Sequence, residues 1–134
     1  MTAAVEIIRE FTFEAAHRLP NLPGTHKCSR LHGHSYRFSV HVSGPVDAAS
    51  GWVMDFAAIK DACKPVLSRL DHYYLNDIPG LENPTSERLA EWIWHELEHS
   101  LPMIAAVTVR ETCTSCCVYR GPHGGDSGVE LAWR

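Results

Sequence analysis

The chain has 134 residues, which favours one domain, and its 45% hydrophobic and 21% charged residues are typical of a soluble protein. Its formal net charge of −4 gives no electrostatic reason to expect nucleic acid or an anionic membrane as a partner. No apolar run approaches the ~18 residues of a membrane span, and no secretory pattern is present. We therefore expect a cytoplasmic protein with reduced thiols. The nine histidines are the unusual feature of the composition.

The first predicted element is a strand over residues 5–19. Its odd positions are mostly apolar, whereas glutamates dominate the even positions, as expected for a half-buried antiparallel strand. His17 falls on the apolar side. Taken alone, such a histidine is more often a hydrogen-bonded core residue than a ligand. A loop with two prolines follows over residues 20–30, and it carries Cys28 near its end.

The second strand, predicted for residues 32–43, begins with two histidines. His32 and His34 are two residues apart, so their side chains share the apolar face. Consecutive strands usually pair, which would bring His17 to the same cavity. Three neutral imidazoles with an open position are the ligand set of a catalytic zinc site. The alternative is a group of buried histidines with partners in the core, and we favour the metal site.

Cys28 has more than one interpretation on the residues alone. It is a further metal ligand, a reactive thiol beside the metal, or an incidental loop cysteine. On the residues alone we favour a structural or incidental cysteine, and the other two interpretations stay open.

Two helices are predicted in the middle of the chain. Asp55 is a good N-cap for a helix over residues 56–70, in which Pro65 should cause a kink or start a second segment. Thr85 or Ser86 caps a second helix that runs to about residue 99.

Three further histidines lie in or after these helices. Asp71–His72 follows the first helix and is either a base-orienting pair or ordinary loop polarity. His95 and His99 lie among glutamates on the second helix, and we interpret them as part of a solvated face.

A third strand is predicted over residues 104–113, with a return strand at 117–120 and a last edge strand at 129–133. Glu111 falls on the apolar parity, where a carboxylate is costly unless it has a partner, so it is a candidate functional residue. The alternative is an end-of-strand residue that reaches solvent. Three cysteines between the strands have half the spacing of a zinc ribbon but no second pair, and we interpret them as hairpin residues: Cys113, Cys116 and Cys117.

The predicted order is β-β-α-α-β-β, which gives an α+β fold with an antiparallel sheet and both helices on one face. An open sheet of four strands leaves two edges unpaired. Proteins tend to pair or cover such edges, so we expect association between copies.

Several motifs together resemble the 6-pyruvoyl-tetrahydropterin synthase family over residues 9–121. They are Phe13-Glu-Ala-Ala-His17, Cys28-Ser-Arg-Leu-His32-Gly-His34, Leu70-Asp-His-Tyr-Tyr-Leu-Asn76, Asn83-Pro-Thr-Ser-Glu87 and Glu111-Thr112. Within that family, the gap between Cys28 and His32 and the run from Leu75 to Ser86 are similar to the 6-carboxy-5,6,7,8-tetrahydropterin synthases of queuosine biosynthesis. The resemblance implies a T-fold, in which subunits join their sheets into a barrel, commonly as hexamers. Residues 122–134 depart from it as a tail of uncertain role.

The resemblance also implies roles for individual residues. The metal ligands would be His17, His32 and His34, and the catalytic residues would be Cys28, Asp71, His72 and Glu111. Asp71 and His72 often act across a subunit boundary in this family. Glu111 would also anchor the pterin ring, with Thr85 and Ser86 as further substrate contacts. Arg18, Lys27 and Arg30 are candidates for the triphosphate.

The implied reaction converts 7,8-dihydroneopterin triphosphate and water to 6-carboxytetrahydropterin, acetaldehyde and triphosphate. Two alternatives stay open. The sister activity, formation of 6-pyruvoyl-tetrahydropterin, shares the zinc, the thiol and the pterin pocket. A non-catalytic zinc-binding scaffold would hold the metal without consuming the substrate.

Overall fold

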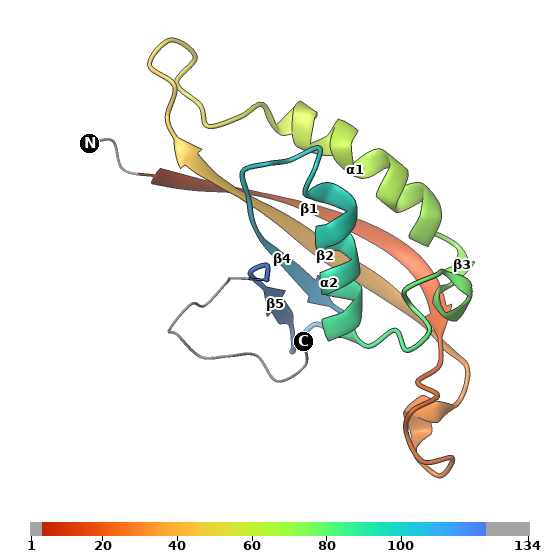
Figure 1. Cartoon of the computed structure of the whole chain (residues 1–134). Helices are drawn as coiled ribbons and strands as arrows, with labels where there is room; N and C mark the ends of the chain where they lie inside the picture. Colours follow the sequence, from red (N-terminus) through yellow and green to blue (C-terminus); the bar gives the residue numbers. More distant parts are fainter. Residues whose placement is uncertain (1–3, 123–134) are drawn as a thin grey trace.

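A computed structural model describes residues 4–122 of the protein (Figure 1). Its strands are β1 (Ala4–His17), β2 (His32–Pro45), β3 (Tyr73–Tyr74), β4 (Ile104–Arg110) and β5 (Cys117–Tyr119). Its helices are α1 (Phe56–Leu70) and α2 (Ser86–Leu97), with short 3-10 turns η1 (Lys27–Ser29) and η2 (Leu75–Asp77). Among the described residues, no helix is long and apolar enough to cross a membrane.

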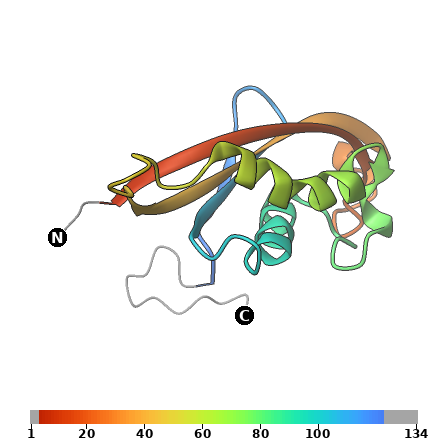
Figure 2. The same cartoon turned by 90° about the horizontal axis from the view of Figure 1, so that it is seen from above.

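The five strands form one sheet in the order β3-β1-β2-β4-β5. All neighbours are antiparallel except β1 and β3, which are parallel. β1 and β2 pair along their whole length, from Ala4 opposite Pro45 to His17 opposite His32. Both helices cover the same face of the sheet (Figure 2). The predicted α+β arrangement, with two helices on one face, is therefore confirmed.

The alternation that predicted the strands also forms the core. Apolar side chains of β1 and β2 stack in cross-strand pairs, with the rings of Phe13 and Tyr36 4.9 Å apart and those of Phe11 and Phe38 5.2 Å apart. Helix α2 buries Leu89, Ile93 and Leu97 at helical spacing on this layer. Each such apolar side chain stabilises the fold by roughly 1.5–3 kcal/mol when it leaves water. The central sheet is therefore a rigid support for residues at its ends.

The structure corrects several predicted boundaries. Helix α1 continues through Pro65 as one segment rather than starting a second one there. Pro65 has no backbone N–H to donate to the carbonyl of Asp61, so one helical hydrogen bond is missing. Because both residues are exposed, water can donate a hydrogen bond to that carbonyl instead. The N-cap of α2 is Thr85, whose hydroxyl accepts from the Arg88 backbone N–H at 3.1 Å, and α2 ends at Leu97 rather than near residue 99.

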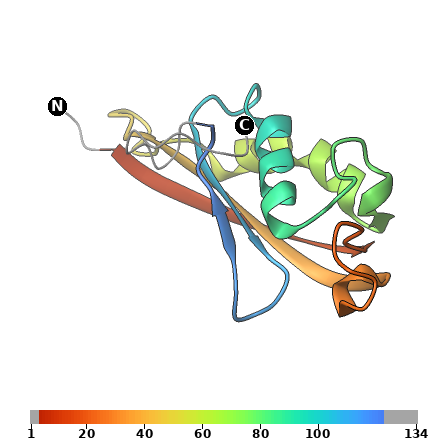
Figure 3. The same ribbon diagram turned by 60° about the horizontal axis from the view of Figure 1, so that its bottom comes forward.

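Other differences lie along the sheet. The two-residue strand β3 was not predicted, and it adds an edge beside β1. β4 ends at Arg110, so Glu111 starts the β4–β5 hairpin loop, which extends away from the helices (Figure 3). β5 packs against α2 through Trp94 and Tyr119, whose rings meet edge to face at 5.7 Å. The predicted strand at 129–133 lies outside the described residues.

Candidate metal centre and active site

Three histidines come together where β1 ends and β2 begins. His17 is the last residue of β1 and lies directly opposite His32, the first residue of β2, while His34 follows on the same face. One ring nitrogen from each lies within 4.8 Å of the others. His17 is buried, and His32 and His34 are half-buried. The structure therefore brings together all three predicted metal-ligating residues, in a group that could hold a metal ion.

The second ring nitrogens of two of these histidines are already bonded. His17 Nδ1 lies 2.9 Å from the Pro84 carbonyl oxygen, and His32 Nδ1 lies 2.7 Å from the Arg30 carbonyl oxygen. A carbonyl can only accept, so in both rings Nδ1 carries the proton and donates it. The Nε2 atom of each neutral ring is then left with a free lone pair, the form in which imidazole binds a metal.

These two Nε2 atoms face each other at 3.0 Å. Two lone pairs at that distance repel unless a cation lies between them or one ring is protonated. Burial is the largest cause that lowers the pKa of His17, so protonation of that ring is disfavoured. Two ligands of a tetrahedral zinc ion at ~2.05 Å would be roughly 3.3 Å apart. The donor atoms and their spacing thus fit a small divalent metal ion.

Tyr36 packs against the buried side of the histidine cluster. It is fully buried, and its ring meets those of His17 and His34 edge to face at 5.7 and 5.4 Å. Burial, and then the Glu111 carboxylate, raises the pKa of its hydroxyl far above the ordinary value. Within residues 4–122 this hydroxyl has no hydrogen-bond partner. The ring therefore supports the imidazoles by packing.

Glu111 faces the same cluster. Its carboxylate lies 3.9 Å from His34 Nε2 and is only 23% exposed, so the inward orientation expected from its parity is present. It also lines a cavity of about 450 Å³ together with Ser86, Thr112 and Cys116. A carboxylate beside a cavity can accept paired N–H donors from a ligand. Thr85 lies beside Ser86, but its hydroxyl caps α2.

Cys28 lies on turn η1 and is half-buried. Its carbonyl accepts from the Leu19 backbone N–H at 2.8 Å, two residues beyond His17. This bond draws the loop between β1 and β2 together near the histidines, and it places the Cys28 backbone at the end of the hairpin where the loop connects the two strands. The side chains of Arg18, Lys27 and Arg30 are exposed on the same loop.

Asp71 and His72 lie at the β3 edge of the sheet. An Asp71 carboxylate oxygen accepts from the Glu14 backbone N–H at 2.9 Å and lies 3.0 Å from His72 Nδ1. The His72 backbone N–H donates to the Glu14 carbonyl at 2.6 Å. In the described part of the chain, no hydrogen bond joins this pair to the histidine cluster.

His72 is held in an unusual conformation. Its φ of 66° lies in the left-handed region, and its side chain is 77% exposed. With His34 and Tyr73 it lines an open cavity of about 520 Å³ on the surface. The structure therefore presents the Asp71–His72 pair outward, on a backbone that costs energy to hold.

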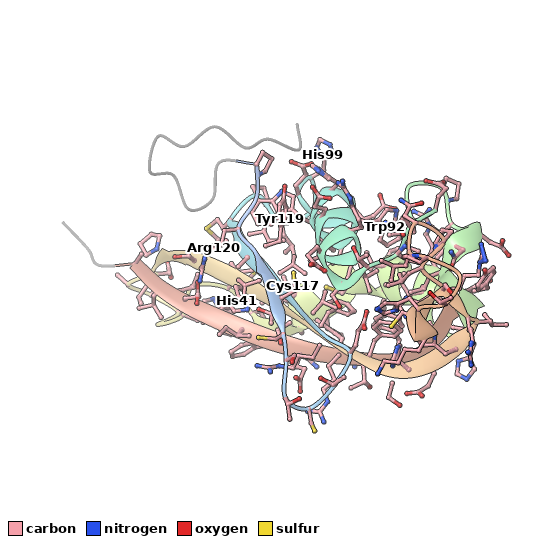
Figure 4. All side chains as sticks on the ribbon, turned by 90° about the horizontal axis from the view of Figure 1, so that it is seen from below. His41, Trp92, His99, Cys117, Tyr119 and Arg120 are labelled. Carbon is pink, nitrogen blue, oxygen red and sulfur yellow. The ribbon has the colours of Figure 1, made fainter. Side chains whose placement is uncertain are left out.

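The other cysteines and histidines of residues 4–122 do not form a second metal-binding group. Cys113 and Cys116 are exposed on the hairpin loop, and no cysteine is in a disulfide among the described residues. The histidine cluster is the one group of metal-binding side chains with close ligand atoms found in residues 4–122. His95 pairs with Glu98 at 2.9 Å on the exposed face of α2, and His99 lies exposed beyond the helix (Figure 4), so their interpretation as solvated residues is confirmed.

Sequence reasoning missed the groups that orient the ligands. Two of them are the backbone carbonyls of Arg30 and Pro84, which have no side-chain signal. A third is Asn76, whose side chain bonds the backbone next to His17. An asparagine in a short turn usually bonds its own neighbours, so its long-range partner could not be found from the pattern alone.

The profile of the 6-pyruvoyl tetrahydropterin synthase family matches residues 6–122. The match covers most of the chain, and it spans both the histidine cluster and the Asp71–His72 edge. The chain therefore belongs to this family of T-fold enzymes, as its motifs predicted.

Individual relatives agree with this. A 6-carboxy-5,6,7,8-tetrahydropterin synthase of Synechocystis sp. is 48% identical over 122 residues, which cover 87% of this chain and 93% of the relative. The human 6-pyruvoyl tetrahydrobiopterin synthase is 34% identical and covers 87% of this chain and 91% of its own. The solved structure of 6-pyruvoyl tetrahydropterin synthase from Caenorhabditis elegans superposes with a TM-score of 0.82 at 31% identity, over 90% of this chain and 97% of that one.

Proposed function

We propose that the protein is a zinc-dependent 6-carboxy-5,6,7,8-tetrahydropterin synthase of queuosine biosynthesis. It would convert 7,8-dihydroneopterin triphosphate and water to 6-carboxytetrahydropterin, acetaldehyde and triphosphate. The observation that carries the proposal is the three-histidine cluster with its free Nε2 atoms, in a chain 48% identical to a synthase of that name.

The Nε2 atoms of His17 and His32, with a ring nitrogen of His34, would hold the zinc ion. When bound, zinc supplies Lewis acidity toward oxygen atoms of the substrate side chain. The carbonyls of Pro84 and Arg30 keep two of the rings in the tautomer that this ligation needs. Buried Tyr36 keeps bulk water away from the inner side of the cluster.

Other residues would handle the substrate. The Glu111 carboxylate accepts N–H donors of the pterin ring, and Ser86 lies in the same cavity. Thr85 lies beside Ser86 as a further proposed substrate contact, and its hydroxyl also caps α2. The Cys28 thiolate takes the proton from the side-chain carbon, and His72, oriented by Asp71, passes a proton on.

The Asp71–His72 pair would serve the site of a neighbouring subunit. Its side chains are exposed at a sheet edge and make no hydrogen bond to the chain's own cluster within residues 4–122. A homo-oligomer, which we propose to be a hexamer, would bring this edge to the Cys28 end of another copy. Mixed oligomers of Cys28→Ala and His72→Ala chains should then regain part of the activity that each lacks, because some sites receive both intact residues.

The deciding experiment incubates the protein with 7,8-dihydroneopterin triphosphate, with and without a chelator, and identifies both products. Acetaldehyde and 6-carboxytetrahydropterin, lost on chelation and restored by zinc, are expected. The 34% identical human relative favours 6-pyruvoyl-tetrahydropterin as the second candidate product, which would appear without acetaldehyde. A chain that binds zinc but leaves the substrate unchanged would instead be a scaffold. Five free cysteines fit a reducing cytoplasm, where we place the activity.

A further inference from the structure

Asn76 joins two segments that determine how His17 is oriented, although it lies outside the histidine cluster. It sits half-buried on turn η2. Its side chain makes three hydrogen bonds, all to the backbone. Oδ1 accepts from the Arg18 N–H at 3.0 Å, and Nδ2 donates to the carbonyls of Arg18 at 2.8 Å and Glu82 at 3.2 Å.

Both partners adjoin the His17 ring. Arg18 directly follows His17 in the chain. Glu82 lies two residues before Pro84, whose carbonyl accepts from His17 Nδ1 at 2.9 Å. One amide group thus ties the backbone that carries the imidazole to the loop that carries its acceptor.

The chemistry of this position requires an amide. The Arg18 N–H can only donate and the two carbonyls can only accept, so the oxygen and nitrogen of the Asn76 side chain are placed without ambiguity. Aspartate would still accept from the Arg18 N–H, but its second oxygen would face the carbonyl oxygens of Arg18 and Glu82 and repel them. Alanine would lose all three bonds without adding a charge.

We propose that Asn76 is a positioning residue for the metal centre. By holding Arg18 and Glu82 together, it keeps the Pro84 carbonyl on His17 Nδ1. The proton then stays on Nδ1, and Nε2 stays free and directed at His32. The zinc part of this inference rests on the proposed function, whereas the tautomer of His17 does not.

The test compares Asn76→Ala and Asn76→Asp with wild type, and uses Asn21→Ala, an exposed loop asparagine, as the matched control. Histidine tautomers are measured by two-bond ¹⁵N–¹H correlation on metal-free protein at a pH where the imidazoles are neutral. Zinc affinity is measured by competition with a chromophoric chelator. We expect His17 to be the Nδ1–H tautomer in wild type and control, and to shift toward Nε2–H in both Asn76 variants.

Zinc affinity of the Asn76 variants should fall about 10–100-fold, the usual effect of removing a group that orients a ligand. A merely structural role would lower the melting temperature but leave the tautomer and the zinc affinity of the folded protein within twofold of wild type, and that result would overturn the proposal. If wild type shows no turnover yet the tautomer shifts as expected, the proposed function fails and the positioning role stands.

An unfolded variant would report nothing on His17, so one measurement uses wild type alone. The Arg18 amide should be protected from hydrogen exchange, because it donates to Asn76 Oδ1. Exchange of that amide at the rate of an open chain would overturn the proposal.

Discussion

The sharpest quantitative prediction concerns how zinc stabilises the fold. Nε2 atoms of His17 and His32 already face each other at 3.0 Å, so the folded chain presents a site that the unfolded chain lacks. Free zinc at 100 times the dissociation constant should then raise the free energy of unfolding by about 2.7 kcal/mol. A chain of 134 residues has an unfolding entropy of roughly 0.3 kcal/mol per kelvin. The melting temperature should therefore rise by roughly 10 °C.

His32→Ala removes one of the three ligands. If this weakens zinc binding by about 100-fold, the same free zinc stabilises the variant by about 0.4 kcal/mol, a shift of under ~2 °C. Calorimetric scans at one protein concentration, with zinc buffered by a chelator, measure both shifts. His99→Ala, at an exposed position beyond α2, is the control and should keep the full shift. An equal zinc shift in His32→Ala and wild type would refute the assignment of the ligands.

Three further predictions concern single side chains. Tyr36→Phe should leave the free energy of unfolding unchanged or raise it by up to ~1 kcal/mol, because the buried hydroxyl has no partner in residues 4–122; a loss above ~1 kcal/mol in urea titrations would show that it has one. His72→Gly should stabilise the chain by roughly 1 kcal/mol, since glycine accepts the φ of 66° without strain, while turnover is lost. The bond from the Glu14 N–H is the largest cause that lowers the pKa of Asp71. Asp71 therefore contributes stability that is present above its unfolded pKa of about 3.9 and is lost as the pH falls through the lower folded value. Asp71→Asn should remove this acidic loss of stability when the free energy of unfolding is measured as a function of pH.

The histidine cluster could be predicted because strand geometry alone determines it. A period of two puts His32 and His34 on one face, and pairing of consecutive strands brings His17 opposite His32. The aromatic residues that stack behind them follow the same alternation. At these positions the local residue pattern and the tertiary structure agree, so the sequence alone was sufficient to predict the cluster.

The same reasoning failed where hydrogen bonds of backbone groups determine the local structure. Strand β3 has only two residues, and it exists because the His72 backbone bonds Glu14 across the sheet edge. No second helical segment starts at Pro65, because the one carbonyl that loses its partner lies on the solvent side of α1. Neither the register of a short edge nor the hydration of one carbonyl has a signal in the residue pattern.

The two halves of the proposed site differ in how they are built, and the difference has a functional consequence. In the metal half, the rings of His17 and His34 pack against buried Tyr36, and backbone carbonyls fix the tautomers of His17 and His32. The proton-transfer half, Asp71–His72, is exposed, and His72 is strained. In an isolated chain, the strained and exposed His72 costs stability and contacts no group of the metal half through a hydrogen bond in residues 4–122. Metal binding should therefore be a property of each folded chain, whereas turnover should require the assembly that places His72 beside another copy's thiol.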